Sequence, residues 1–328
     1  MLYIPNDSLN PYYNLAFEEF VLKELDPEED YVLLWRNAPA VIIGKFQNTI
    51  EEINQEFVKE NGIKVVRRMS GGGAVYHDLG NLNYTFIVRR IPDNFLDFKQ
   101  FTASVLKTLK MLGVAAEFNS RNDLTIEGKK FSGNAQYVTK NRLLHHGTLL
   151  FDSKLDNIQK ALNVSRDKIE SKGIKSVRSR VTNISEHLKQ KLTIEDFKQL
   201  LLKNIFNGRE IKKYELSAEE KNKVSKLARG KYETWDWNYG QSPEYNLKKA
   251  RWFASGRIEV RLNIKDGIIN ECKIYGDYFA KRDPTEIENL LKGYKYQEEV
   301  ISTLLADVDL ESYFGDITLE EILQLFLG

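Results

Sequence analysis

Three consecutive glycines, Gly71, Gly72 and Gly73, follow a strand-like run that ends in Arg67 and Arg68. Without Cβ atoms, this stretch of backbone can adopt positive φ angles and let a ligand lie against its N–H groups. The two arginines supply positive charge for a phosphate or a carboxylate. No Gly-Lys-Ser/Thr and no helical pattern follow, so the loop is neither a P-loop nor a dinucleotide fingerprint. A plain glycine turn beside solvated arginines is the alternative interpretation.

Helical and strand-like patterns alternate on both sides of this loop. Helices are predicted after Asn10-Pro11, which offer a cap and a first-turn proline, around Ile53 and Phe57, and over residues 98–112. Strands are predicted over residues 31–35, 40–43, 65–68, 82–88 and 148–151. The strand over 82–88 alternates apolar and more polar residues, which predicts that it is half-buried. A hairpin is predicted to turn at Glu127-Gly128.

A second, smaller region begins near residue 246. Residues 152–230 are mainly helical in pattern, with helix starts at Thr193 and Ser217, and residues 232–246 are aromatic and aperiodic. Beyond them, alternating apolar residues lead into Lys265-Asp266-Gly267, a hairpin signal, and helices start near Pro284 and Thr318. We therefore predict two domains, 1–245 and 246–328. The second carries a net charge of −4 and the first +5.

Composition excludes several classes of protein. The 328 residues carry a net charge of +1, which argues against a nucleic-acid binder that works by bulk electrostatics. No apolar stretch approaches the roughly 20 residues of a membrane span, and the N-terminus lacks the features of a signal peptide. A single cysteine, Cys272, excludes an intrachain disulfide. We expect a cytoplasmic protein that binds neither membranes nor nucleic acid.

A lysine pair in the predicted hairpin is a candidate for chemistry. Lys130 precedes Ser132-Gly133, and its ammonium can point into a pocket and neutralise a carboxylate and a phosphate together. Asp123, which precedes the hairpin on the same strand, can orient that lysine or bind a divalent cation. Solvated surface positions are the alternative for both side chains.

Two further segments are chemically distinctive. His145 and His146 precede Gly147, but adjacent strand residues point to opposite faces and no third ligand stands at metal spacing, so zinc is disfavoured. A structural histidine beside a glycine that admits the backbone close to a ligand is the preferred interpretation. Residues 172–184 are polar, basic and small, which is typical of a phosphate-covering loop or of a solvated basic face.

Four motifs occur in a fixed order: Arg-Arg-x-Ser-Gly-Gly-Gly-Ala-Val-Tyr-His-Asp, Lys-Phe-Ser-Gly-Asn-Ala, His-His-Gly-Thr-Leu-Leu and Ser-Val-Arg-Ser-Arg-Val-Thr-Asn-Ile. Together they closely resemble the lipoate–protein ligase A family. The resemblance runs from the first predicted helix to the tail and includes residues 235–243, Trp-Asp-Trp-Asn-Tyr-Gly-Gln-Ser-Pro. The tail resembles the accessory domain of that family.

The resemblance implies an α+β catalytic domain shared with biotin ligases, with mixed β-sheets flanked by helices, and a small α/β C-terminal domain. It implies ATP with Mg²⁺, and lipoate, or octanoate in its place, as the acyl substrate. Lipoate and ATP would form lipoyl-adenylate and pyrophosphate. The lipoyl group would then pass to a lysine on a lipoyl domain, in a dehydrogenase E2 subunit or the glycine-cleavage H protein.

The resemblance also implies roles for individual residues. Lys130 would be catalytic, with Asp123 orienting it or binding Mg²⁺. Lys129 is the alternative catalytic lysine, although it departs from the Lys-x-Ser-Gly spacing of the motif. Lipoate would contact Trp35, Arg68, Ser70, Gly71, Gly72, Gly73, Val75, His146 and Gly147. ATP or the adenylate would contact Arg68, Ala74, Tyr76, His77, Asn83, Asn122, Lys130, Arg178, Arg180 and Val181.

Three alternatives stay open. A lipoyl or octanoyl transferase that takes a preformed acyl donor is one, although its cysteine-dependent members need a nucleophile that residues 1–245 lack. A biotin ligase would show a Gly-Arg-Gly-Arg-x-Gly loop in place of Arg-Met-Ser-Gly-Gly-Gly. A non-catalytic lipoate-binding module is the third, and the presence of both Lys130 and Arg68 argues against it.

Overall fold

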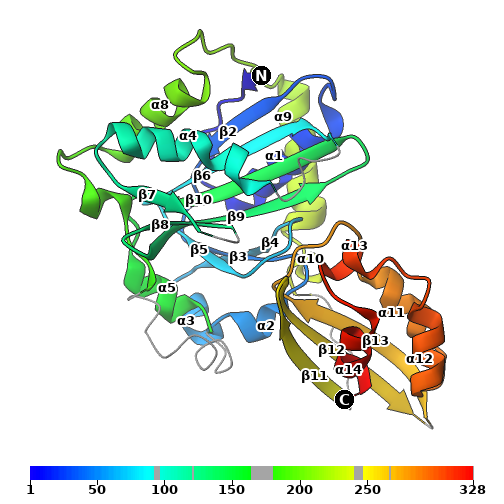
Figure 1. Cartoon of the computed structure of the whole chain (residues 1–328). Coiled ribbons are helices and arrows are strands. Elements are labelled where there is room, and N and C mark those ends of the chain that lie inside the picture. Colours follow the sequence, from blue (N-terminus) through cyan, green and yellow to red (C-terminus); the bar gives the residue numbers. More distant parts are fainter. Residues whose placement is uncertain (92–96, 120–121, 164–179, 240–246, 266, 328) are drawn as a thin grey trace. The chain divides into compact units, whose positions relative to one another are not determined.

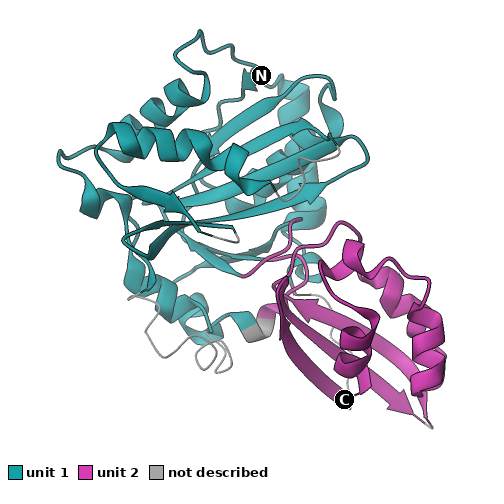
Figure 2. Ribbon diagram, in the orientation of Figure 1, with its two compact units in different colours: residues 1–43, 50–68, 74–238 teal, residues 44–49, 69–73, 239–328 magenta. Residues whose placement is uncertain are grey.

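The computed structural model describes the chain except for residues 92–96, 120–121, 164–179, 240–246, 266 and 328 (Figure 1). It divides into two compact units (Figure 2). The N-terminal unit comprises residues 1–43, 50–68 and 74–238, and the C-terminal unit comprises residues 44–49, 69–73 and 239–328. The predicted boundary at 245/246 falls in the segment 240–246, outside the described residues.

Two sheets form the framework of the N-terminal unit. The larger has seven strands in the order β1-β2-β6-β10-β9-β8-β7, and apart from the parallel pair β1 and β2 its neighbours are antiparallel. These strands are β1 (Leu2–Tyr3), β2 (Tyr31–Trp35), β6 (Asn81–Arg89), β7 (Ala116–Phe118), β8 (Asp123–Ile126), β9 (Lys129–Val138) and β10 (Arg142–Leu150). The smaller sheet has the order β4-β3-β5, with β3 (Ala40–Ile43), β4 (Lys64–Arg67) and β5 (Val75–His77). The β8–β9 hairpin turns at Glu127 and Gly128, both with positive φ, as predicted.

The helices of this unit begin where their caps predict. Asn10 caps α1 by accepting from the N–H of Tyr12, and Thr193 and Ser217 form capping boxes. The helix expected around Ile53 and Phe57 is instead divided in two, because Ile53 pairs as a bridge with Leu162. No described helix has the length and apolar character to cross a membrane. The helices are α1 (Pro11–Glu24), α2 (Thr49–Glu52), α3 (Gln55–Glu60), α4 (Phe98–Met111), α5 (Leu155–Ala161), η1 (Ile184–His187), α8 (Ile194–Ile205), α9 (Ala218–Leu227), η2 (Ala228–Tyr232) and α10 (Trp235–Asn238).

One hydrophobic cluster of the N-terminal unit lies on one face of the large sheet. Leu82, Tyr84 and Leu143 belong to one buried cluster with Phe101 of α4 and Phe197 of α8. Figure 1 shows these two helices beside the sheet. We call this face of the sheet the core face.

The prediction that the β6 strand is half-buried was wrong. Its more polar residues Asn81, Asn83 and Thr85, which point away from the core face, are also fully buried. Thr85 donates to Glu18 of α1, a helix that buries Asn14 and Glu18 as well as its apolar residues. Alternation predicted the two faces correctly but could not predict that the second face is covered.

The C-terminal unit is a three-stranded antiparallel sheet with helices packed on one face. Ile258, Val260 and Leu262 are fully buried among the helices, and the Lys265 hairpin forms as predicted. The strands are β11 (Leu247–Phe253), β12 (Gly256–Lys265) and β13 (Ile268–Gly276), and the helices are α11 (Thr285–Leu291), α12 (Glu298–Leu305), α13 (Leu310–Phe314) and α14 (Leu319–Leu327).

Two short segments from early in the sequence belong to the C-terminal unit. The N–H of Lys45 donates to the carbonyl of Ser70 over 2.9 Å, and the N–H of Gly72 donates to the carbonyl of Tyr278 over 3.2 Å. Gly72 has a φ of 88°, and a Cβ on Gly71 would lie 2.3 Å from the Tyr278 carbonyl oxygen. Gly71 and Gly72 are therefore required by the local backbone, whereas a Cβ at Gly73 would meet nothing within 4 Å.

Side chains complete this attachment. The rings of Phe46 and Tyr278 stack with centroids 5.1 Å apart. The Lys45 ammonium lies 2.7 Å from Asp283. Residues 44–49 and 69–73 are thus integral parts of the C-terminal unit.

Candidate active site

The register of the large sheet places several predicted residues in one row. Trp35 of β2 pairs with Asn83 of β6, which pairs with Thr148 of β10. The Thr148 hydroxyl accepts from the N–H of Gly133 over 3.2 Å, and Gly133 pairs with Asp123 of β8. Because side chains alternate between faces along a strand, this row lies opposite the core face. We call it the polar face.

The next row of the polar face holds a buried hydrogen-bond network. The Trp35 indole N–H donates to the Thr85 hydroxyl over 3.0 Å, and Thr85 donates to Glu18 of α1. His146 Nδ1 lies 3.1 Å from both carboxylate oxygens of Glu18. His146 is therefore held in place by a charged group that the sequence analysis did not single out. Two consecutive glutamates, Glu18 and Glu19, amid the apolar residues of the first predicted helix were the available signal.

Lys130 and Asp123 form an ion pair at the far end of this face. Their Nζ and Oδ1 atoms are 2.7 Å apart, and both side chains are about one-third exposed. A register shift between Leu124 and Thr125 adjusts the pairing of their strands. Lys130, and not Lys129, makes this contact.

Gly133 makes room for the ammonium group. A Cβ added at Gly133 would lie 2.8 Å from Lys130 Nζ and 3.8 Å from Asp123 Oδ1. Any larger residue there would displace the lysine. Gly133 is thus a second residue missed from the sequence, although it stood within the quoted Lys-Phe-Ser-Gly motif.

Asn122 and Gly147 serve the protein's own packing in this structure. Asn122 donates to the carbonyl of Asn134 over 2.6 Å, and Asn134 donates back to the carbonyl of Asn122 over 2.9 Å. A Cβ on Gly147 would lie 2.2 Å from Asn134 Oδ1 and 2.6 Å from the Tyr84 ring. The space at Gly147 is therefore filled from the core face, while its neighbour His146 points to the polar face.

The side chains of His77 and Tyr76, both predicted to bind the nucleotide, point to opposite faces of β5. His77 is fully buried and accepts through Nδ1 from the Asn37 amide over 3.1 Å, which places its proton on Nε2. Burial lowers the pKa of His77 to about 3, and the positive charge of Arg68 adds to the effect, so the ring is neutral. Tyr76 points to the other face of the strand, where its hydroxyl accepts from Asn157 over 3.3 Å.

Arg68 brings a buried positive charge to the end of β4. Its guanidinium donates to the carbonyl of Ile42 over 3.2 Å. Burial lowers its pKa to about 10, repulsion from Arg67 acts in the same direction, and Glu18 opposes both. At neutral pH the side chain is still protonated.

The other predicted contacts are distributed as follows. Val75 and Ala74 are half-buried at the start of β5. Ser70, Gly71, Gly72 and Gly73 belong to the C-terminal unit. Arg180 directly precedes Val181, and Arg178 lies outside the described residues.

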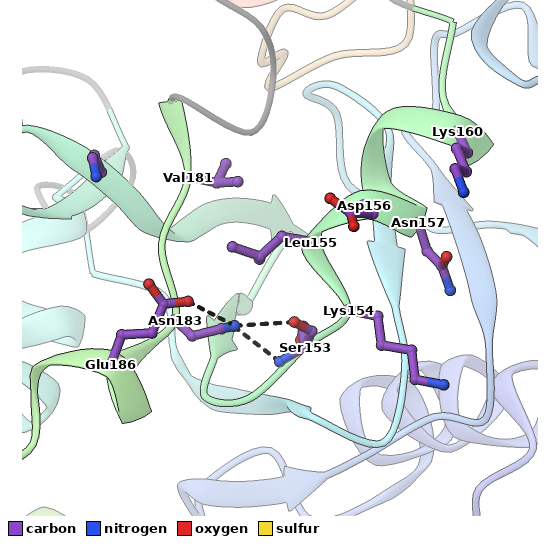
Figure 3. Close-up of a pocket in the computed structure, with 10 residues that line it drawn as sticks. Ser153, Lys154, Leu155, Asp156, Asn157, Lys160, Val181, Asn183 and Glu186 are labelled. Carbon is purple, nitrogen blue, oxygen red and sulfur yellow. Dashed lines mark hydrogen bonds between the residues drawn. The ribbon is translucent and has the colours of Figure 1, made fainter.

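An open cavity of about 540 Å³ is lined by residues of the segments 153–160 and 181–186 and by Lys129, which precedes Lys130 (Figure 3). Val181 lines it and pairs with Lys130 as an isolated bridge, and the N–H of Thr182 donates to the Lys130 carbonyl over 3.0 Å. Eight of its ten lining residues are polar or charged: Lys129, Ser153, Lys154, Asp156, Asn157, Lys160, Asn183 and Glu186.

Several buried polar atoms lack a hydrogen-bond partner in the part of the chain that the structure describes. Among them are His77 Nε2, Asn81 Oδ1, Asn83 Nδ2 and Ser153 Oγ. A buried polar group without a partner costs roughly 1–3 kcal/mol, so such groups suit a site that a polar ligand completes. Among the described residues, no three His, Cys, Asp or Glu side chains are grouped so as to hold a metal ion.

Comparison with known proteins shows which families the two parts of the chain match. Residues 10–206 match the family described as lipoyl protein ligase A/B catalytic domain, and residues 242–326 match bacterial lipoate protein ligase C-terminus. The lipoate-protein ligase LplJ of Bacillus subtilis (strain 168) is 51% identical over 99% of each chain.

Solved structures agree. P. falciparum LipL1 in complex with lipoate superposes with a TM-score of 0.78 at 29% identity over 94% of each chain. A lipoate-protein ligase A bound with ATP superposes with a TM-score of 0.64 at 26% identity, over 73% of this chain and 98% of that one. The α+β fold expected from the resemblance is confirmed.

Proposed function

Because the chain belongs to the lipoate–protein ligase family, we propose that it activates lipoate with ATP and then transfers the lipoyl group to a lysine amine of a lipoyl domain. In the first step a carboxylate oxygen of lipoate bonds to the α-phosphorus, and pyrophosphate leaves. In the second step the amine nitrogen bonds to the acyl carbon, the bond to the adenylate oxygen breaks, AMP leaves, and the amine proton passes to solvent. Dehydrogenase E2 subunits and the glycine-cleavage H protein are the proposed acceptors.

The observation that carries this proposal is the Lys130–Asp123 ion pair on the polar face. Attack of a carboxylate on a phosphate brings two anions together, and a cation held at that point stabilises the charge that develops. Asp123 holds the ammonium in position over 2.7 Å. When substrates enter, the ammonium can turn toward the lipoyl carbonyl and the α-phosphate while Asp123 retains its orientation.

The buried groups around the pair supply the remaining recognition. Arg68 is a buried cation for the lipoate carboxylate or the adenylate phosphate. Asn83 and His77 offer unpartnered polar atoms to the nucleotide. Trp35 provides an apolar wall for the dithiolane ring while its N–H stays bonded to Thr85. The predicted contacts from Ser70 to Gly73 and from Arg178 to Val181 are part of the same proposal.

Mg²⁺ would arrive with ATP and neutralise phosphate charge. Mg²⁺ in nucleotide sites is typically held by one or two carboxylates together with the phosphates. Asp123 is the carboxylate beside Lys130 and would be the protein's ligand. The described residues offer no three-ligand cluster, which fits a metal held mainly by its nucleotide.

Lipoate-dependent exchange between ATP and pyrophosphate, without acceptor protein, tests the first step. Lys130→Ala should lower the exchange rate by at least about 100-fold, the magnitude typical of removing a group that stabilises developing charge. Its side chain is 38% exposed, so the melting temperature should change little. Lys140→Ala, an exposed lysine in the turn after β9, is the matched control and should retain full exchange.

Two outcomes would contradict the proposal. Normal exchange in Lys130→Ala would remove that residue from the chemistry. An absence of lipoate-dependent exchange in the unchanged protein, with lipoyl transfer from a preformed acyl donor, would favour the transferase interpretation.

A further inference from the structure

The two arginines that precede the glycine loop have different surroundings, although they are adjacent in the sequence. Arg68 is buried, and its guanidinium donates to the carbonyl of Ile42 over 3.2 Å. Arg67 is half-buried, and as its neighbour on the strand it points to the opposite face. Its guanidinium donates through Nε to the carbonyl of Trp237 over 3.1 Å and through Nη2 to the carbonyl of Asn238 over 3.2 Å. The fold therefore directs the Arg67 guanidinium at the protein's own backbone.

The backbone of Arg67 is held by the same two partners. Strand β4, which Arg67 ends, lies at the edge of the small sheet. The N–H of Arg67 donates to the Asn238 side chain over 2.9 Å, and the Arg67 carbonyl accepts from the Trp237 indole N–H over 2.8 Å. A donor and an acceptor that an edge strand would leave unpaired are thus satisfied by side chains of α10 (Figure 1). We call Arg67, Trp237 and Asn238 the β4 clamp.

The β4 clamp is itself firmly supported. Asn238 is 3% exposed, and its amide nitrogen donates to the carbonyls of Tyr232 over 2.6 Å and Thr234 over 3.0 Å. The Lys231 ammonium lies 4.0 Å from the centre of the Trp237 ring. The clamp is therefore a fixed part of the N-terminal unit and not a chance contact between two surface side chains.

Helix α1 connects the β4 clamp to the polar face. The Tyr232 hydroxyl donates to Glu19 over 2.6 Å, and the Lys231 ammonium lies 2.6 Å from the same carboxylate oxygen. Glu18, the preceding residue of α1, contacts His146 of the polar face. The clamp thus fixes the end of β4 to the helix that supports the polar face.

Arg68 depends on this fixed strand end for its position. The backbone at Arg67 determines where the next side chain leaves the strand. On the inner edge of β4, the N–H of Arg68 donates to the carbonyl of Ile43 over 2.9 Å, so the strand end is held from both edges. A buried guanidinium serves as an anion receptor when its position is fixed before the anion arrives, because the bound geometry then costs no further ordering.

We propose that Arg67 and Trp237 are positioning residues for the proposed reaction. They hold the end of β4 so that the Arg68 guanidinium meets the lipoate carboxylate or the adenylate phosphate, and Arg67 itself contacts neither anion. This inference rests on the proposed function, which assigns Arg68 to those anions. It separates the roles of two arginines that the sequence presents as a pair.

A double-mutant cycle in the full-length protein tests whether the β4 clamp acts through Arg68. Trp237→Phe removes the indole N–H and keeps an aromatic ring, and it should lower kcat/KM for lipoate in the exchange reaction about 10-fold. In the Arg68→Ala background the same change should lower it by less than about twofold, because the guanidinium that the clamp positions is already absent. If Arg68→Ala does not fold, Arg68→Gln takes its place in the cycle. A clamp that serves stability alone would lower kcat/KM by the same factor in both backgrounds, and that result would overturn the inference.

Arg67→Lys separates positioning from charge. The variant keeps the positive charge but lacks the forked donors that reach two carbonyls, so it should be about as impaired as Arg67→Ala, roughly 10-fold in kcat/KM. Full activity in Arg67→Lys, with a loss in Arg67→Ala, would show that Arg67 acts by charge alone and would overturn its positioning role. Trp235→Phe, at a 54% exposed tryptophan of the same helix, and Arg209→Lys, at an exposed arginine after α8, are the matched controls and should keep normal kinetics.

The same measurements distinguish failure of this inference from failure of the proposed function. An impaired Arg68→Ala with an additive cycle would overturn the inference and leave the proposed function standing. Normal exchange in Arg68→Ala would remove Arg68 from the site and the inference with it. If the unchanged protein shows no lipoate-dependent exchange, the proposed function itself fails.

Discussion

The two faces of the large sheet are made by the same strands, yet around Asn83 and Thr85 they differ in chemistry. On β6, Leu82 and Tyr84 enter an apolar core, whereas Asn83 and Thr85, the residues in between, join the polar face. Both sets are buried. Burial alone therefore does not distinguish structure from function here.

The distinction lies in how polar atoms are satisfied. On the core face, Asn134 is engaged by Tyr84 and Asn122, so its polar groups serve the protein itself. On the polar face, Asn83 Nδ2 has no partner among the described residues. His145 Nε2 on the core face also has no partner among the described residues, so the contrast holds between Asn83 and Asn134 and not for every polar atom of the two faces.

The largest expected difference between the faces is in stability, at neighbouring positions of β6. Leu82→Ala leaves a cavity in the core and should cost about 2–5 kcal/mol of unfolding free energy. Asn83→Ala loses one hydrogen bond to Asn81 and should cost about 1 kcal/mol or less while raising the KM for ATP. Urea denaturation and exchange kinetics on both variants make the comparison. Equal stability losses would show that the two faces do not divide in this way.

A smaller effect is expected at Gly147. An added methyl group would overlap Asn134 and the Tyr84 ring, so Gly147→Ala should lower the unfolding free energy by about 1–3 kcal/mol. The KM for lipoate should rise only as far as the fold around Gly147 is disturbed. If stability is unaffected and lipoate binding is lost, the glycine serves the ligand directly, as the sequence predicted.

The smallest expected effect is on the pH dependence of stability, which depends on His77. The pKa of His77 is about 3 in the folded chain, below its ordinary value of 6.5, so the unfolded chain binds the proton more tightly. Stability should therefore fall as pH falls from 6.5 toward 3. His145 on the core face shifts in the same direction, so only the comparison with His77→Gln isolates one ring.

Between pH 7 and pH 5, the His77→Gln variant should lose about 1–2 kcal/mol less than the unchanged protein. Denaturation midpoints at the two pH values measure this difference. Identical losses in the two proteins would mean that His77 is protonated in the folded state as readily as in water.

Local signals predicted most of the elements. The caps at Asn10, Thr193 and Ser217 act within one helical turn, and Glu127-Gly128 defines its own hairpin, so neighbouring residues suffice to predict them. Lys130 stood out because a motif of adjacent residues surrounds it. These features depend on sequence distances of a few residues.

Long-range partners could not be predicted in the same way. Glu18 meets His146 across 128 positions, and no spacing rule relates them. Gly147 and Gly71 were assigned to a ligand, but their close neighbours prove to be Asn134 and Tyr278, which only the folded chain brings near. A glycine in the sequence indicates that another group packs close to the backbone, but it does not identify that group.

The non-contiguous make-up of the C-terminal unit has a consequence for recombination between relatives. Exchanging residues 247–328 alone would place a foreign Tyr278 carbonyl and Asp283 carboxylate against the original Gly71 and Lys45. A chimera that also carried residues 44–49 and 69–73 would transfer the whole unit. The C-terminal unit thus consists of three segments of chain, and a functional chimera between relatives requires that all three are exchanged together.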